Sequence, residues 1–258
     1  MQQLRSILII SLLCFSLQAK AQHTSASDTL ELHKVMLIPY DPRYYLSDAD
    51  RDIMEQSKTA PEKFRSDFRH NIDRHVQRAI GRSYYCISLL NDTADALQEA
   101  LYAIMGRTGY RYEKAIPLTP KPVEFEKSSS KNNSNTKTHE DSKTATSYIP
   151  VKHDAVYMHA VVSKPAELFE KISSEYDVDY FVFLTQFDIK TNYNSCMDIA
   201  RKIYRREVMV HFSIYDKTGK VIAGSYATSF FPSDSNQANS IIGDCFPEIA
   251  AYIAGSLP

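Results

Sequence analysis

The sequence has no tryptophan and few glycines or cysteines: seven and four, respectively, among 258 residues. Because the glycines are scattered singly, we expect no glycine-rich loop that could cradle a phosphate group. No two cysteines are spaced as Cys-x-x-Cys, and no cysteine–histidine cluster has the spacing of a zinc site. The sequence therefore predicts neither a bound metal nor a cofactor.

An excess of one charge is also missing. Lysine and arginine number 30 against 31 aspartates and glutamates, a formal net charge of −1. Without a strong positive field, nucleic acid is not an expected partner. Aromatic residues are plentiful, with 17 tyrosines and 12 phenylalanines in a chain that is 43% hydrophobic. This composition favours a folded core built on pleated sheet.

The first 21 residues are typical of a signal peptide. Arg5 supplies the positive start, residues 7–17 form an apolar run, and Ala19-Lys20-Ala21 has the small-x-small pattern of a cleavage site. The apolar run is short for a membrane span. We therefore expect cleavage before Gln22, export to the periplasm, cell envelope or medium, and a net charge that falls to −3.

Cysteine placement bears on lipid attachment and on disulfides. Leu13 precedes Cys14 where a lipoprotein signal needs a small residue, so we expect membrane attachment only through a partner. The exported chain keeps Cys86, Cys196 and Cys245, an odd number in an oxidising compartment. Cys86 lies in an apolar run that favours a buried thiol. A Cys196–Cys245 disulfide is the preferred pairing, although the spacing alone does not fix connectivity.

Hydrophobic periodicity predicts the element order β-α-β-α-loop-β-α-β-β-β-α. Strands are expected at 34–40, 83–90, 155–162, 180–189, 208–215 and 221–231, and helices at 61–80, 94–105, 164–176 and 236–257. Gly219 is expected to take a positive φ in the turn between the last two strands. The fold class is α/β (α+β), with a single mixed sheet of five to six strands packed by about four helices.

One segment lacks the residues needed to fold. Residues 127–147 contain no aromatic or branched aliphatic side chain, and three prolines precede them. Such a segment cannot bury enough surface to offset its ordering entropy. Because the alternation of strands and helices resumes after it, we expect a disordered insertion at about 119–148 within one domain of residues 22–258.

Three stretches carry a resemblance to known proteins. They are Tyr176–Leu184, with its Asp-Tyr strand entry; Val208–Ile222, with Asp-Lys-Thr-Gly-Lys at its turn; and the opening strand Val35–Tyr40. The chain is similar there to CsgG-like curli-secretion lipoproteins, penicillin-binding-protein activators and the N-terminal domain of TolB. Thr185 or Gln186 replaces a glycine of that pattern, and no lipobox is present. The resemblance implies an envelope α/β domain that binds proteins and carries over no catalytic residues.

Three aspartates raise the question of calcium. Asp48, Asp50 and Asp52 follow the start of an EF-hand loop, but Ile53 and Thr59 stand where that loop needs Gly and Glu. We therefore expect a solvated acidic loop, or one that caps a short helix, rather than a calcium site.

Tyrosines in polar stretches suggest a binding surface. Tyrosine is frequent at interface hot spots because it is large, amphipathic and loses little conformational entropy on binding. The candidate interface residues are Tyr40, Tyr44, Tyr45, Tyr193 and Tyr204.

Two functions remain open from the sequence. The first is an exported, non-enzymatic protein that binds other envelope proteins as an accessory of an outer-membrane or secretion complex. The second is an exported hydrolase, with Cys86 or Ser83 as nucleophile, a histidine, and an acid from Asp48, Asp50 or Asp52. No hydrolase motif such as G-x-S-x-G occurs.

Overall fold

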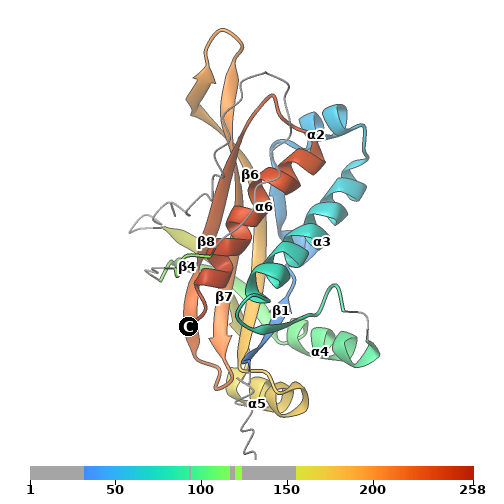
Figure 1. The fold of residues 1–258 in the computed structure, drawn as a ribbon, viewed down its shortest axis with the longest axis vertical. Helices are drawn as coiled ribbons and strands as arrows, with labels where there is room; N and C mark the ends of the chain where they lie inside the picture. Colours follow the sequence, from blue (N-terminus) through green and yellow to red (C-terminus); the bar gives the residue numbers. More distant parts are fainter. Residues whose placement is uncertain (1–31, 93, 117–119, 124–154) are drawn as a thin grey trace, which may run out of the picture. The chain divides into compact units, whose positions relative to one another are not determined.

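The structure, a computed structural model, describes residues 32–92, 94–116, 120–123 and 155–258. The expected signal peptide and most of the expected insertion lie outside these residues. The described part has a mixed sheet of six strands, a separate two-stranded sheet and five α-helices (Figure 1). The predicted α/β class with a mixed sheet is confirmed.

The six-stranded sheet joins strands from both sides of residues 124–154. Its order is β3-β1-β6-β7-β8, with the short β2 also beside β6. The β3-β1-β6 pairs and the β2-β6 pair are parallel, whereas β6-β7 and β7-β8 are antiparallel. The strands are β1 (Lys34–Ile38), β2 (Tyr45–Ser47), β3 (Tyr85–Ser88), β6 (Tyr180–Asp198), β7 (Ile203–Asp216) and β8 (Val221–Pro232).

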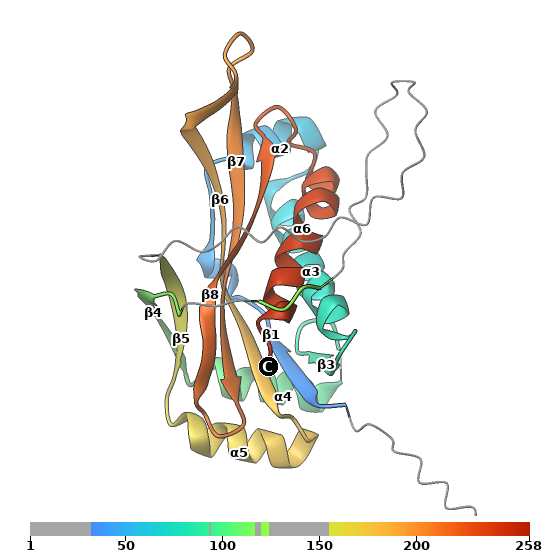
Figure 2. The same cartoon turned by 60° about the vertical axis from the view of Figure 1, so that its left-hand side comes forward.

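Helices cover both faces of this sheet (Figure 2). The helices are α2 (Asp50–Ser57), α3 (Pro61–Ile80), α4 (Asp95–Met105), α5 (Pro165–Tyr176) and α6 (Ala238–Gly255). The α3 sequence has an apolar residue at every fourth position, and all five of these side chains are buried: Phe64, Phe68, Ile72, Val76 and Ile80.

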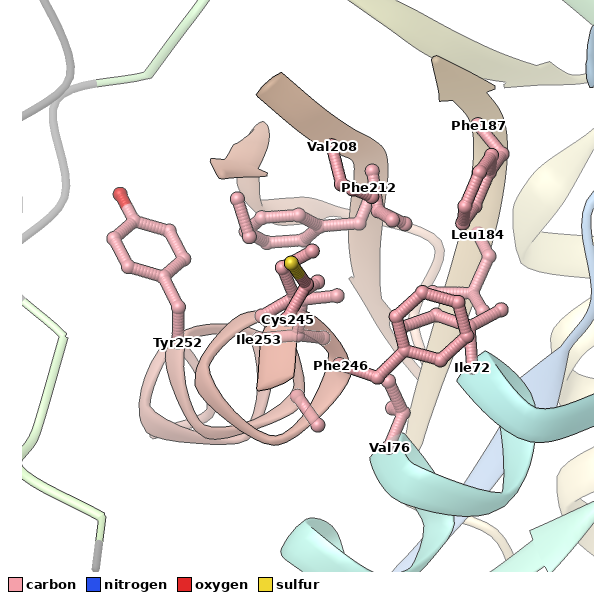
Figure 3. Close-up of a cluster of buried hydrophobic side chains, with 14 of the residues drawn as sticks. Ile72, Val76, Leu184, Phe187, Val208, Phe212, Cys245, Phe246, Tyr252 and Ile253 are labelled. Atoms are coloured by element: carbon pink, nitrogen blue, oxygen red, sulfur yellow. The ribbon is translucent and has the colours of Figure 1, made fainter. Parts of the chain in front are cut away.

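The core on one face lies between α3, α6 and the strands. Figure 3 shows how the side chains meet there: Phe246 and Ile253 come from α6, and Ile72 and Val76 come from α3. Phe187 of β6 stands opposite them, with its ring centroid 5.8 Å from those of both Phe68 and Phe246. On the other face, α4 and α5 pack against β1, β6 and β5, with Phe169 stacked on Phe181 at 4.2 Å.

Two features differ from the predicted arrangement. β5 (Val156–Val162) does not join the main sheet but pairs with β4 (Thr108–Lys114), a strand the pattern does not predict. β5 lies across β7 instead, and its backbone is bonded to side chains there: the Met158 N–H donates to His211 Nδ1 at 2.9 Å. The polar stretch between β1 and α3 contains β2 and the short helix α2, so five helices surround the sheet rather than four; a short helix beside the acidic residues was one of the expected alternatives.

Two glycines stand where the backbone requires them. Gly219 takes a φ of +85°, which confirms the predicted turn between β7 and β8. Residues 120–123, placed by sequence in the disordered insertion, are described and packed: the Lys121 N–H donates to the Gly255 carbonyl at 2.7 Å. A Cβ on Gly255 would lie 2.2 Å from the Lys121 carbonyl oxygen, so this approach requires glycine.

Candidate functional site

Strands β6 and β7 continue well beyond their neighbours. β2 ends opposite Ile189, and β8 pairs with β7 no further than Arg205. From Asn192 to Tyr204 the two strands therefore form a hairpin of their own, here called the arm (orange in Figures 1 and 2). The predicted strands stop at 189 and begin again at 208, so this hairpin was not expected.

The arm carries three large apolar side chains in solvent. Tyr193 is 68% exposed, Met197 60% and Ile199 84%. Ile199 lies in the turn that closes the hairpin, and it is more exposed than any other large apolar side chain among the described residues. Clustered exposed apolar side chains indicate an interaction site, whereas isolated ones are ordinary.

A bulge gives the arm its local shape. The register between β6 and β7 shifts between Asn192 and Cys196, so the intervening β6 residues have no partner on β7. The Asn192 side chain accepts from the Asn194 N–H at 3.1 Å within this bulge. Tyr193 turns toward Tyr204, and their rings meet edge to face with centroids 5.3 Å apart. Bulges of this kind re-aim side chains and prevent further strands from adding to an edge.

Buried and half-buried polar contacts hold the base of the arm. Arg206 of β7, 5% exposed, donates to Asp52 of α2, to Asn236 and to Thr191 Oγ1. Asp48 accepts from the Thr191 N–H at 2.9 Å and from its hydroxyl at 3.0 Å. These contacts fix both strands at the point where the sheet ends.

The connection between β8 and α6 braces the other side. Ser233 exchanges hydrogen bonds with the Tyr204 backbone, donating from its N–H at 2.8 Å and accepting on Oγ at 2.9 Å. Arg201 in the arm's turn pairs with Asp234 at 2.8 Å. With both strands tied down, the apolar side chains are presented by a supported hairpin rather than by a long loop.

The structure separates the five candidate interface tyrosines. Tyr193 and Tyr204 come together in the arm, as described above. Tyr44 and Tyr45 are half-buried, Tyr44 against Tyr110 at 4.6 Å between centroids and Tyr45 stacked on Phe187 at 5.5 Å.

The prediction for Tyr40 is wrong. Its side chain is 1% exposed and stacks on Phe187, and burial raises its pKa. It belongs to the core because α3 packs over the end of β1, where the Arg69 side chain donates to the Tyr40 carbonyl at 2.9 Å. Sequence reasoning missed Met197 and Ile199, whose only signal was two apolar residues isolated in a polar run.

The expected Cys196–Cys245 disulfide is not formed in the structure. Cys196 is exposed in the arm, whereas Cys245 is fully buried in α6 against β7 (Figure 3). Cys196 lies in the arm beyond the sheet and Cys245 lies in the core beneath the sheet, so the two sulfur atoms are not placed to form a bond. Cys86 is mostly buried, and burial raises the pKa of its thiol, as befits an inert cysteine.

The residues considered for a hydrolase do not assemble. Asp50 pairs with Arg65 near the start of α3, while Ser83 and Cys86 follow its end. A helix of 20 residues is about 30 Å long, which keeps nucleophile and acid apart. Asp48, Asp50 and Asp52 are each bonded to Thr191, Arg65 or Arg206 rather than to a histidine.

A second polar cluster lies buried beneath β4 and β5. Asp188, fully buried, accepts from Gln186 at 2.6 Å and from Lys190 at 2.7 Å, and His211 Nε2 lies 3.7 Å from it. Burial raises the pKa of Asp188, but the nearby His211 imidazole and the hydrogen bonds from Lys190 and Gln186 outweigh burial and hold the pKa below the usual value. His211 Nδ1 accepts from the Met158 N–H, so the cluster joins the two sheets.

Two further observations concern what the described part holds. No group of three or more histidine, cysteine or acidic side chains there is arranged to bind a metal ion. None of the described helices is long and apolar enough to cross a membrane.

Comparison of the chain with protein-family models, with curated proteins and with solved structures gave no match.

Proposed function

We propose that the chain is an exported, non-enzymatic protein that binds other envelope proteins as an accessory or assembly factor of an outer-membrane or secretion complex. The observation that carries this proposal is the arm, which holds Tyr193, Met197 and Ile199 in solvent on a hairpin beyond the sheet.

Energetics favour a binding role for these side chains. Leaving a large apolar side chain in water forgoes about 1.5–3 kcal/mol of burial free energy. The folded domain gains little from these three side chains at the arm, because they remain 60–84% exposed. A partner that covered them would recover that free energy.

Support at the base makes the arm suited to binding. A partner that orders a loose loop must offset the entropy that the loop loses, and this cost lowers affinity. Here Arg206 and Asp48 already fix the strands. Two of the tyrosines that suggested an interface, Tyr193 and Tyr204, lie in this supported arm.

The experiment compares capture of envelope proteins by matched variants of residues 22–258. The arm variant carries Tyr193→Ser, Met197→Ser and Ile199→Ser together. The control carries Tyr102→Ser on α4, where the tyrosine is 74% exposed and lies outside the arm. Each is immobilised, exposed to solubilised native envelope, and its bound proteins are quantified by mass spectrometry.

We expect a defined set of proteins to bind the wild type and the Tyr102→Ser control equally and to drop at least tenfold with the arm variant. Loss of about 2 kcal/mol of apolar contact gives such a factor. Equal capture by all three proteins would refute the arm as the binding site. Turnover of ester or peptide substrates by the wild type would refute the non-enzymatic proposal.

A further inference from the structure

A pocket of about 450 Å³ opens beside the base of the arm. Its apolar lining comes from Tyr45 and Leu46 of β2; Ile189 of β6 borders the pocket, but its side chain is fully buried in the core. Leu46 is 46% exposed and Tyr45 is half-buried, so Leu46 is the part of the apolar lining most accessible from solvent. Ile189 is followed directly by the residues that lead into the arm, so a partner seated on the arm lies next to this pocket.

The two cations that line the pocket each have an acidic partner. Arg65 is paired with Asp50, which also accepts from the Tyr45 hydroxyl at 2.7 Å. Lys190 is paired with Asp188 at 2.7 Å, and Asp188 is buried behind the pocket wall. Both cations of the lining are therefore already compensated.

Asp48 is the exception. Both hydrogen bonds to its carboxylate come from Thr191, one from the N–H and one from the hydroxyl. No lysine, arginine or histidine of the described chain lies within 4 Å of it in an ion pair. A carboxylate offers about four acceptor positions. Asp48 thus keeps acceptor capacity and a net negative charge at an exposed position of the lining.

We infer that this pocket binds a lysine or arginine side chain of the protein that docks on the arm. Such a side chain combines an apolar stem with a terminal cation. The stem matches Tyr45 and Leu46, and the cation matches Asp48. The inference rests on the proposed function, because the partner that seats on the arm delivers the side chain.

The arrangement does not fit a calcium ion. Calcium takes six to eight oxygen ligands. The neighbouring Asp50 is held by Arg65, and Asp52 is held by Arg206, so one carboxylate remains for a cation. A single organic cation needs no more than that.

The test titrates ¹⁵N-labelled residues 22–258 with N-acetyl-arginine methylamide and follows backbone amide shifts by NMR. The uncharged citrulline analogue has nearly the same shape and serves as the matched ligand. We expect saturable shifts at residues 46–50 and 189–191 with the arginine probe, and about three- to tenfold weaker binding of the citrulline probe, as for loss of one charge-assisted hydrogen bond.

Two variants isolate the charge of Asp48. Asp48→Asn keeps an oxygen for the Thr191 N–H but removes the charge, and we expect it to bind arginine as weakly as wild type binds citrulline. Asp177→Asn is the control, since Asp177 lies outside the pocket in a left-handed conformation that asparagine tolerates. Unchanged arginine binding in Asp48→Asn, or equal binding of both probes to wild type, would overturn the inference.

Failure here is distinguishable from failure of the proposed function. If the arm variant loses its partners while the arginine probe shows no shifts in the pocket, the arm remains a binding site and only the pocket assignment is wrong. If capture is unaffected by the arm variant, the arm is not the binding site and the observation that carries the proposed function fails.

Discussion

Strands β6 and β7 pass through two environments along their length. In the sheet, their apolar side chains are covered on both faces, and Phe187 and Phe212 are fully buried. In the arm, β6 and the turn that follows it carry Met197 and Ile199 in solvent. Side chains of one chemical class therefore build the core at one end and are left for a partner at the other. Substitutions along these strands should separate stability from binding.

The largest effect is expected in the covered half. Phe187→Ala removes a ring that touches β2, α3 and α6, and leaves a cavity in the core. We expect the free energy of unfolding to fall by about 3–5 kcal/mol. Urea denaturation followed by circular dichroism measures this. A loss below about 1 kcal/mol would mean that the sheet is not packed as described.

A buried acid gives the covered part a pH dependence. Burial on α3 raises the pKa of Asp73 to about 6, although Ser88 and Asn91 donate to it and lower the value. Because the folded state then holds this proton more tightly than the unfolded state, stability falls as pH rises from about 4 to about 6 and stays lower above that. The difference is about 3 kcal/mol at most.

Chemical denaturation at several pH values tests this prediction. The fall in stability between pH 4 and 7 should be present in the wild type and absent from Asp73→Asn. Asp67→Asn, on the same helix but exposed, is the control and should keep the wild-type profile. Identical profiles for wild type and Asp73→Asn would contradict the assigned burial.

The boundary between the two environments depends on Arg206. Arg206→Met keeps the length of the side chain but removes its hydrogen bonds to Asp52, Asn236 and Thr191. We expect a loss of about 1–3 kcal/mol in stability, because buried Asn236 loses its donor. Amide hydrogen exchange in the arm, residues 192–204, should become faster. Unchanged exchange there would show that the base contacts do not hold the arm.

The smallest effect on stability is expected from the arm itself. The combined Tyr193→Ser, Met197→Ser and Ile199→Ser variant should unfold within about 0.5 kcal/mol of the wild type, since exposed side chains contribute little to folding. Thermal and urea denaturation measure this change. Destabilisation by more than about 2 kcal/mol would mean that the arm packs on the rest of the chain and is not a free surface.

The sequence predicts what local patterns determine. The four-residue spacing of Phe64, Phe68 and Ile72 is enough to define α3, and Gly219 is enough to place its turn. The arm could not be found in this way, because a hairpin exposed on both faces has no reason to alternate apolar and polar residues. The bulge between Asn192 and Cys196 further interrupts any regular alternation of side chains along β6.

Other features depend on contacts between distant segments. Tyr40 becomes a core residue only because α3 crosses it, and β5 leaves the main sheet because β4, an unpredicted strand, offers it a partner. The spacing of Cys196 and Cys245 in sequence carries no information on their separation in space. The pocket beside Asp48 likewise combines β2, α3 and β6.

The most direct test of the arm as the binding site is site-specific photo-crosslinking in the producing cell. A photoreactive amino acid replaces Ile199 in one strain and Tyr102 in another, two exposed positions on different parts of the chain. We expect irradiation to yield a discrete crosslinked envelope protein from position 199 and none from position 102. Crosslinks from position 102 alone, or the same products from both positions, would contradict the account.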